Sequence, residues 1–274
     1  MTKKSVIIVS IFCGLIALMG VLFGAVFCLR NQEVKVVGDT PIAVSREEII
    51  HAGGLENGQS IFMINKDKTI NNIEAKFAYL KVIQIKTTDL MTIQIRVRAR
   101  HEMFYVHENE KFYVLDEELK VLDILEATTT EPTHLTKIGS GELDISSATM
   151  KCDFVGTQQQ RQTTYDLYVA MTTVVTKNNG ANEVYFTRQD MRDTLLHLDF
   201  ENLDTYNKIV IDTKFGVNLD IEKPQQDLQT KINICFSTIE QFILDANDKE
   251  KSGTIKIYYD DIGEMKTVYI PETN

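Results

Sequence analysis

Tryptophan is absent from the 274-residue chain, and proline and cysteine occur only four times each. No segment repeats at a fixed period, which excludes a solenoid or a propeller. Cys13 and Cys28 lie in an apolar N-terminal stretch, whereas Cys152 and Cys235 stand alone further along the chain. The latter two either form a disulfide or are small buried hydrophobic residues, and isolated cysteines are more often the second. No spacing among the cysteines and histidines is that of a metal site.

The sequence also lacks a recognisable catalytic motif. Two His-Glu pairs stand close together in 101–108, but a zinc protease helix needs histidines at i and i+4, and position 105 is tyrosine. The same segment alternates between apolar and polar residues, which favours a strand with exposed charges. The Gly-Ser-Gly at 139–141 lacks the spacing of a nucleophile elbow, and the acidic pair at 260–261 is typical of a solvated turn. We therefore expect neither catalysis nor a bound cofactor or metal ion.

Positive charge is scarce beyond the first thirty residues. The formal net charge of the chain is −10, but Lys3, Lys4 and Arg30 precede residue 31 and no acidic residue does. Residues 31–274 therefore hold 39 acidic and 26 basic side chains, a net charge of −13. This balance disfavours nucleic acid or an anionic lipid surface as a partner.

One long stretch, residues 5–29, carries no charge and exceeds the roughly 20 apolar residues that cross a bilayer. A cleaved signal peptide has a shorter apolar core of about 7–15 residues, and a lipoprotein signal needs a small residue where Phe27 precedes Cys28. We therefore predict an uncleaved signal anchor. The lysines on its N-terminal side predict a cytoplasmic tail at 1–4 and place the chain beyond the anchor outside the cytoplasm.

Within the predicted anchor, Gly20 and Gly24 form a GxxxG pattern. Small residues at this spacing let two membrane helices approach closely, so both glycines are candidates for helix packing in the membrane. The pattern occurs often by chance in apolar segments and is a weak indication.

A second glycine pair, Gly53 and Gly58, has the spacing of a nucleotide-binding P-loop. That motif follows a strand and contains a lysine, whereas Gln59 stands at the lysine position and a capped helix precedes the loop. We instead expect Gly53 or the adjacent glycine to end that helix in a left-handed conformation. Gly58 is then expected to turn the chain so that Ile61 and Phe62 reach the core.

Residues 31–100 have the pattern of a small α/β unit. A short strand at 33–38 is followed by a helix that begins at the capping box Ser45-x-x-Glu48. Asn65 is the expected N-cap of a second helix within 65–80, and two strands follow in 81–100, where apolar and polar residues alternate. The order strand, helix, helix, strand, strand predicts a three-stranded sheet covered by two helices.

From residue 101 onward the pattern is mostly that of strands. Three short strands are expected between 103 and 125, followed by a loop at 128–142; residues 165–175 are compatible with a helix and 190–200 are ambiguous. The segment 208–221 predicts a hairpin, and two strands at 253–261 and 265–270 close the fold. A helix within 227–248 has one apolar stripe, formed by Leu228, Ile232, Cys235, Ile239, Phe242 and Ile243.

The ordered set of motifs resembles the FtsQ/DivIB family of bacterial division proteins over nearly the whole chain. The family's first outer unit, a POTRA domain, has a V-x-G strand, an S-x-x-E-I helix and a G-L-x-x-G-x-x-I/L-F loop; here these are "VKVVG", "SREEI" and "GLENGQSIF". The family's E-R-x-P signature is matched only at Arg100, with Ala99 and Glu102 replacing the acid and the proline. "FYVLDEELKVLD" matches the next segment, with Leu119 in place of glycine. "TKINICFSTIEQFI" and "IKIYYDD" match the late helix and strand.

The resemblance implies the domain organisation. It predicts a cytoplasmic tail at 1–4, a transmembrane anchor at 5–29, a POTRA domain (β-α-α-β-β) at 31–100, a mostly antiparallel β domain with helices at 101–270 and a short tail at 271–274. It also implies a non-enzymatic, single-pass membrane protein at the division septum, whose partners are single-pass proteins of the FtsB/DivIC and FtsL types.

A chain that ends in strands can leave a sheet edge to which a partner strand adds. The resemblance places the partner surface at the C-terminal strands, so we expect it at the edge built by 254–259 and 265–270. The candidate anchors are Tyr258, Tyr259 and Tyr269, because tyrosine is enriched at binding hot spots. Asp260 is a further candidate, because the resemblance aligns Tyr259 and Asp260 with the family's Tyr-Asp after the penultimate strand. The alternative is that the tyrosines simply cover the sheet.

A second function is compatible with a POTRA unit, namely that of a membrane-anchored protein of envelope assembly or secretion. A translocation pore would need alternating strands of about 10 residues. The later strands here are short and interrupted by charges, which favours the division protein.

Overall fold

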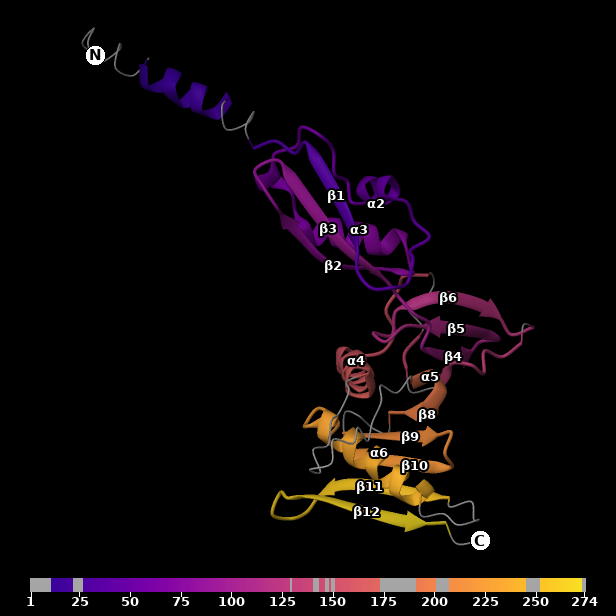
Figure 1. Ribbon diagram of the computed structural model, residues 1–274. Helices are drawn as coiled ribbons and strands as arrows, with labels where there is room; N and C mark the ends of the chain where they lie inside the picture. The colour runs from indigo at the N-terminus through magenta and orange to yellow at the C-terminus, as the bar shows by residue number, and fades with distance from the viewer. Residues whose placement is uncertain are drawn as a thin grey trace. The chain divides into compact units, whose positions relative to one another are not determined.

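The computed structural model of the chain describes residues 11–21, 27–128, 130–139, 143–145, 148, 151–172, 191–200, 207–244 and 252–272. Of residues 240–244 it describes the backbone only. The chain divides into two units, Met1–Arg100 and His101–Asn274, which are described in turn (Figure 1).

Residues 11–21 are helical, and among the described residues no helix is both long and apolar enough to cross a membrane. The rest of the predicted anchor up to residue 26, including Gly24, lies outside the described residues. Cys28 and Leu29, which the sequence assigned to the anchor, belong to the folded first unit. Cys28 forms an isolated antiparallel bridge with Ser60, and the Leu29 side chain is fully buried.

The first unit contains the predicted order of elements. They are β1 (Asn31–Val36), α2 (Arg46–Ala52), the 3-10 helix η1 (Ile61–Met63), α3 (Lys66–Lys76), β2 (Leu80–Thr87) and β3 (Thr92–Ala99). The sheet has the order β1-β3-β2, with β1 parallel and β2 antiparallel to β3. Ile49 of α2 and Ile73 of α3 share one core with Ile95 of the central strand, so both helices cover the same face (Figure 1).

Both predicted helix caps are present. The hydroxyl of Ser45 accepts a hydrogen bond from the N–H of Glu48 at 3.3 Å, and the Glu48 carboxylate accepts one from the Ser45 N–H at 2.9 Å. This reciprocal pair is the capping box, and it starts α2 where the sequence predicted. The side chain of Asn65 accepts from the N–H of Lys68 at 3.0 Å and caps α3.

The loop that resembles a P-loop is a helix stop followed by a turn. Gly54 and Gly58 have φ angles of +66° and +89°, a region that glycine occupies without steric cost. Ile61 packs against the core as predicted. Phe62 does not: its side chain is 72% exposed, so the prediction that both residues reach the core is wrong for Phe62.

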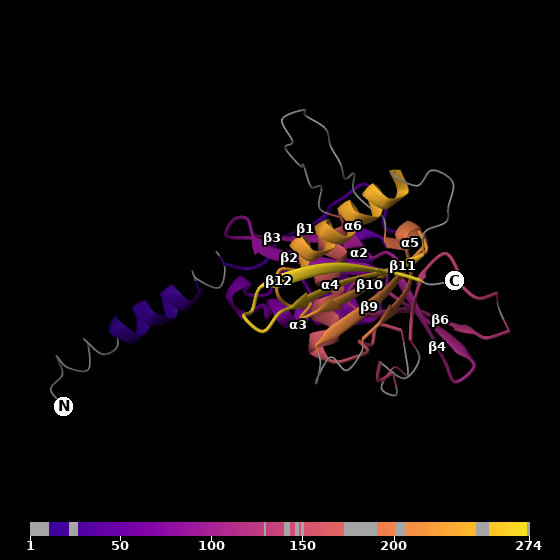
Figure 2. The ribbon, with the colours of Figure 1, turned by 90° about the horizontal axis from the view of Figure 1, so that it is seen from below.

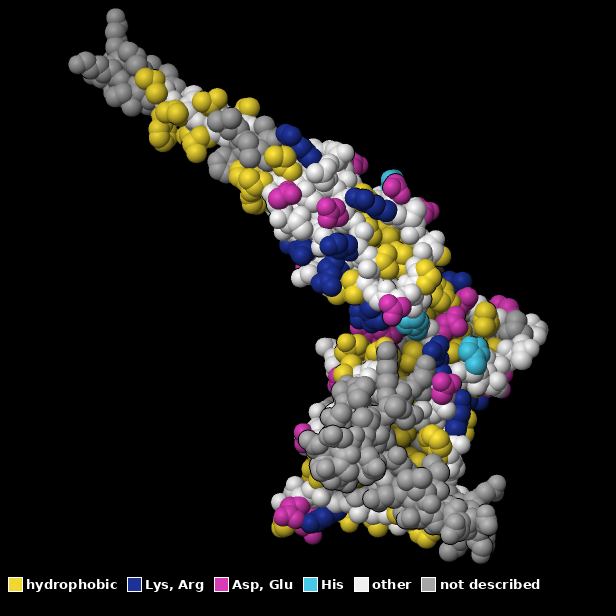
Figure 3. All heavy atoms as spheres, in the orientation of Figure 1, with side chains coloured by type: hydrophobic (Ala, Val, Ile, Leu, Met, Phe, Trp, Pro, Cys, Tyr) yellow, Lys and Arg dark blue, Asp and Glu magenta, His cyan; other side chains and the backbone are white. Residues whose placement is uncertain are grey.

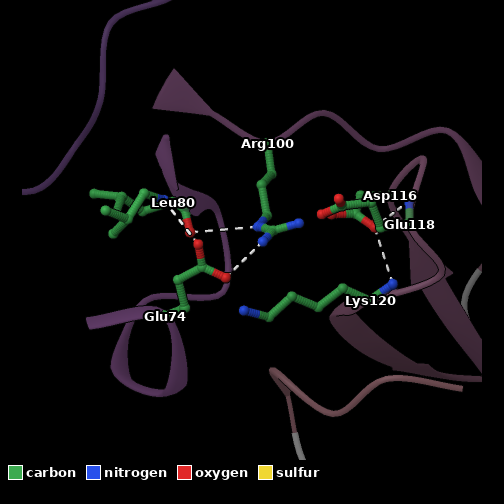
Figure 4. A network of polar contacts seen from close by, with 7 residues as sticks. Glu74, Leu80, Arg100, Asp116, Glu118 and Lys120 are labelled. Carbon is green, nitrogen blue, oxygen red and sulfur yellow. Dashed lines mark hydrogen bonds and ion pairs between the residues drawn. The ribbon is translucent and has the colours of Figure 1, made fainter. Parts of the chain in front are cut away.

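Arg100 ties together three elements of the first unit. Its side chain is buried, its Nη2 lies 2.7 Å from Glu74 Oε2 in α3, and its Nε donates to the carbonyl of Leu80 in β2 at 3.3 Å (Figure 4). Glu74 also accepts from the N–H of Val82 at 2.8 Å. The arginine that matches the family signature therefore holds α3 against the sheet.

The second unit is an α+β fold built on one mixed sheet. Its elements are β4 (Phe104–Glu108), β5 (Lys111–Leu115), β6 (Val121–Glu126), β7 (Thr136–Ile138), α4 (Gln158–Thr172), α5 (Met191–Thr194), β8 (Leu195–Asp199), β9 (Lys208–Thr213), β10 (Val217–Glu222), α6 (Leu228–Leu244), β11 (Gly253–Tyr259) and β12 (Met265–Pro271). Nine strands follow the order β12-β11-β10-β9-β8-β7-β4-β5-β6. The pairs β10–β11, β4–β7 and β7–β8 are parallel and the other neighbours are antiparallel.

Helices α4 and α6 pack on the sheet and enclose the core of this unit (Figure 2). The predicted stripe of α6 is buried at Leu228, Ile232, Cys235 and Ile239; the side chains of Phe242 and Ile243 lie outside the described residues. No disulfide joins Cys152 to Cys235. Cys235 is instead a fully buried hydrophobic residue, the alternative that the sequence favoured.

Three segments of the second unit differ from the sequence expectation or complete it. The loop expected at 128–142 contains β7, a strand of only three residues in the middle of the sheet. The ambiguous segment 190–200 changes from helix to strand between Thr194 and Leu195. The position where the family has glycine is a left-handed turn, because Leu119 has a φ of +57°. Asp116 supports this turn by accepting from the N–H groups of Glu118 and Lys120 at 2.8 and 2.9 Å (Figure 4).

Candidate partner-binding edge

Strand β12 is one of the two ends of the nine-stranded sheet. It pairs with β11 from Met265 opposite Tyr259 to Pro271 opposite Gly253, and no strand among the described residues pairs with its other side. The predicted edge included both of the last strands, but β11 lies between β10 and β12. The edge is therefore β12 alone.

The hydrogen-bond phase shows which backbone groups of β12 point outward. Just beyond the two ends of the ladder, the N–H of Asp260 donates to the carbonyl of Glu264 at 3.0 Å, and the N–H of Glu272 donates to the carbonyl of Ser252 at 3.1 Å. In an antiparallel ladder, hydrogen-bonded residue pairs alternate with pairs that are not hydrogen-bonded. Residues 264 and 272 are both bonded toward β11, so the even-numbered residues of β12 between them are also bonded to β11. The N–H and C=O groups of Met265 and Thr267 consequently point away from β11. Pro271 is also an odd-numbered position whose backbone nitrogen points away from β11, so its lack of an N–H removes no hydrogen bond to β11.

The turn before β12 is organised by Asp260. Its carboxylate accepts from the N–H of Glu264 at 2.8 Å and from the N–H of Ile262 at 3.2 Å, and it lies 3.4 Å from the Lys266 ammonium. Burial by itself would raise the pKa of Asp260, but these hydrogen bonds and Lys266 lower it below its usual value. Ile262 is exposed at the tip. Asp260 therefore shapes the turn that starts β12, and Figure 3 shows charged side chains at this turn, at the lower left.

Tyr269 fixes β12 to the sheet. Its ring is partly buried against the core, and its hydroxyl donates to the carbonyl of Ser252 at 3.0 Å. A Cβ at Gly253 would lie 2.6 Å from the carbonyl oxygen of Ile270 and 2.7 Å from the Tyr269 ring. Glycine is thus needed at the start of β11, because the edge strand and its tyrosine occupy that space.

The other two predicted tyrosines lie on β11. Tyr258 is on the open face of the sheet, with the Lys256 ammonium 5.7 Å from its ring centroid. The ring of Tyr259 is contacted by two ammonium groups, those of Lys223 at 4.8 Å and Lys231 at 4.9 Å. These contacts give both tyrosines a role within the sheet, and their part in partner binding stays a prediction.

Lys231 is the residue of this region that sequence reasoning missed. Its side chain is fully buried at the start of α6, and its Nζ donates to the carbonyls of Glu222 and Lys223, both at 2.8 Å. Burial lowers the pKa of Lys231 to about 8. The signal was present in the sequence, because this lysine interrupts the apolar stripe of α6 directly before Ile232. It joins the end of β10 to α6 behind the edge hairpin.

The outer face of β12 carries apolar side chains. Val268 and Ile270 lie opposite Lys256 and Thr254 of β11, and both are exposed. They lie on either side of Tyr269, whose backbone N–H and C=O point outward like those of Thr267. An added strand would therefore find main-chain donors and acceptors together with an apolar strip.

The remaining predicted sites are not part of this arrangement. Gly20 lies in the exposed helix 11–21, and Gly24 lies outside the described residues. The His-Glu segment 101–108 contains a strand, as its alternation predicted. Within the part of the chain that the structure describes, no three His, Cys, Asp or Glu side chains could share a metal ion.

The comparisons with known proteins point to bacterial division. No protein-family model matches the chain. A protein of Clostridium acetobutylicum named "Cell division protein DivIB" is 25% identical over 205 residues, which cover 70% of this chain and 75% of the relative. A protein of the same name from Clostridium tetani is 30% identical over 93 residues, 34% of each chain.

Proposed function

The chain belongs to the FtsQ/DivIB family of cell division proteins, and from that premise we propose that it is a non-enzymatic scaffold of the division complex. In this proposal it links other division proteins at the septum through contacts outside the cytoplasm. Its net negative charge beyond residue 30 supports a protein partner rather than nucleic acid.

The proposal includes a single membrane anchor and a POTRA domain. Residues 5–26 precede the folded first unit, carry no charge and exceed the roughly 20 residues that a bilayer requires. The two lysines at the N-terminus orient the anchor with its N-terminal end in the cytoplasm. The sheet order β1-β3-β2, with both helices on one face, supports the assignment of the first unit as a POTRA domain.

The observation that carries the scaffold mechanism is the outward-facing backbone of β12. A strand from an FtsB/DivIC-type partner would add to this edge and bond to Met265 and Thr267, and an FtsL-type protein would join the same assembly. Main-chain hydrogen bonds give such a contact affinity, and the exposed side chains of Val268 and Ile270 give it selectivity. The turn at Asp260 and the ring of Tyr269 hold the edge in position.

The location of the protein in dividing cells tests this function. A fluorescent protein fused to the cytoplasmic N-terminus is expected to produce a band at midcell, because a division scaffold assembles with its partners at the septum. The matched control is the same fusion to residues 1–26 alone, which keeps the proposed anchor and loses both folded units. A uniform envelope signal from the full-length fusion, equal to that of the control, would contradict the division role and favour a general role in envelope assembly.

A further inference from the structure

Three large apolar side chains are exposed on two neighbouring loops of the first unit. Phe62 and Met63 of η1 are 72% and 85% exposed, and Leu90 in the turn between β2 and β3 is 54% exposed. The ring of Phe62 packs against that of Phe27, with centroids 5.1 Å apart. We call these four residues the apolar cluster. Exposed apolar groups gathered in this way mark contact sites, because a monomer gains nothing by exposing them.

Both loops are bonded directly to the segment that leads out of the proposed anchor. The N–H of Ile61 donates to the carbonyl of Phe27 at 2.9 Å, and the N–H of Leu29 donates to the backbone carbonyl of Gln59 at 2.7 Å. Toward the turn between β2 and β3, the N–H of Arg30 donates to the carbonyl of Met91 at 2.9 Å. Residues 27–30 therefore hold both loops at the end of the unit where the chain enters it (Figure 1).

The chain length between the N-terminal helix and this end limits how far the cluster can lie from a membrane. Only five residues, 22–26, separate the helix 11–21 from Phe27. Five residues span at most about 17 Å, and helical residues span less. These five residues belong to the uncharged stretch itself, so Phe27 follows the proposed span without any polar spacer. Figure 3 shows hydrophobic side chains at this end of the unit.

We propose that the apolar cluster inserts into the outer interfacial layer of the lipid bilayer and seats the first unit on the membrane surface. The proposal rests on the proposed anchor and goes beyond the scaffold function. The ligand is a neutral or zwitterionic lipid interface, because the side chains that make the contact are apolar and uncharged. Through the bonds to residues 27–30, insertion fixes the height of the first unit above the bilayer.

This proposal explains two features that the fold leaves unexplained. Within η1, Ile61 packs against the core, but the ring of the next residue, Phe62, is exposed. Met63 is the most exposed large apolar residue among those described in the unit, although η1 is ordered by the hydrogen bond from the Met63 N–H to the Ser60 carbonyl at 3.0 Å. A lipid interface would cover both side chains.

The absence of tryptophan from the chain allows a direct test. Phe62→Trp places a single indole in the cluster, and Tyr79→Trp places one at an exposed site at the opposite end of β2 as the matched control. The full-length variants are reconstituted into phosphatidylcholine vesicles with and without brominated acyl chains. Flotation confirms membrane insertion, and circular dichroism confirms that both variants fold like the parent.

We expect brominated lipid to quench the Phe62→Trp emission by about half, because interfacial residues lie roughly 5–10 Å into the headgroup and acyl boundary. The Tyr79→Trp emission is expected to stay unchanged. Emission from Phe62→Trp that is typical of water, with no quenching in floating vesicles, would overturn the proposal. A blue shift without quenching would overturn it as well, since a protein would then cover the cluster. Failure of the parent chain to float would overturn the anchor and this inference together.

Discussion

Replacement of Thr267 by proline is expected to reduce recovery of the FtsB/DivIC-type partner at least about tenfold, the change that about 1.4 kcal/mol produces. The Thr267 N–H points away from β11, so the substitution removes a donor offered to an added strand and leaves the ladder with β11 intact. A net main-chain hydrogen bond contributes about 1 kcal/mol, and the proline ring adds a steric clash with the incoming strand. The measurement is co-purification from membranes with the full-length chain as bait.

The controls separate the lost donor from a lost fold. Thr267→Val keeps the N–H and a β-branched side chain, and is expected to recover the partner as the parent does. The same strand already contains a proline, Pro271, at a position whose backbone nitrogen also points away from β11. Deletion of residues 254–274 is a poorer test, because it also removes the fully buried Ile255 and Ile257. Undiminished recovery with Thr267→Pro would place the partner elsewhere.

Replacement of Arg100 by methionine is expected to destabilise the first unit by about 3 kcal/mol, since it removes one partner of a largely buried ion pair. The substitution leaves the Glu74 carboxylate and the Leu80 carbonyl without the contacts at 2.7 and 3.3 Å. Urea unfolding of the full chain in detergent, followed by circular dichroism, measures the loss.

Glu74→Gln is the matched variant for this prediction. It removes the charge and keeps one oxygen, which can accept from the Val82 N–H or from Arg100 but not from both, because they bond to different carboxylate oxygens of Glu74. A smaller loss is therefore expected, about 1 kcal/mol, the net worth of an ordinary hydrogen bond. Equal losses for the two variants would show that the charge, rather than the hydrogen-bond geometry, holds α3 to the sheet.

Local chemistry made the first unit predictable from sequence. Ser45 with Glu48 and Asn65 specify helix starts through hydrogen bonds made within four residues, and both helices begin there. The strict alternation in 91–97 gave the central strand. The exposure of Phe62 could not be read in the same way, because its neighbour Ile61 is buried and nothing in the pattern separates the two.

The second unit depends on contacts between residues far apart in sequence. β7 has only three residues, and its place between β4 and β8 follows from long-range pairing rather than from its own pattern. The same holds for the edge: the tyrosines marked the right hairpin, but only the strand order shows that β12 is outside and β11 inside. Lys231 and the left-handed Leu119 were visible as a charge in an apolar stripe and as a residue in the place of a glycine.

The central claim is that a division partner adds a strand to β12, and site-specific photo-crosslinking in dividing cells tests it most directly. A photoreactive amino acid at position 267, on the outer edge, is predicted to yield an adduct with an FtsB/DivIC-type protein. The same amino acid at the exposed position 83 of the first unit serves as the control. An adduct only with other envelope proteins at position 267, or none at all, would contradict the account.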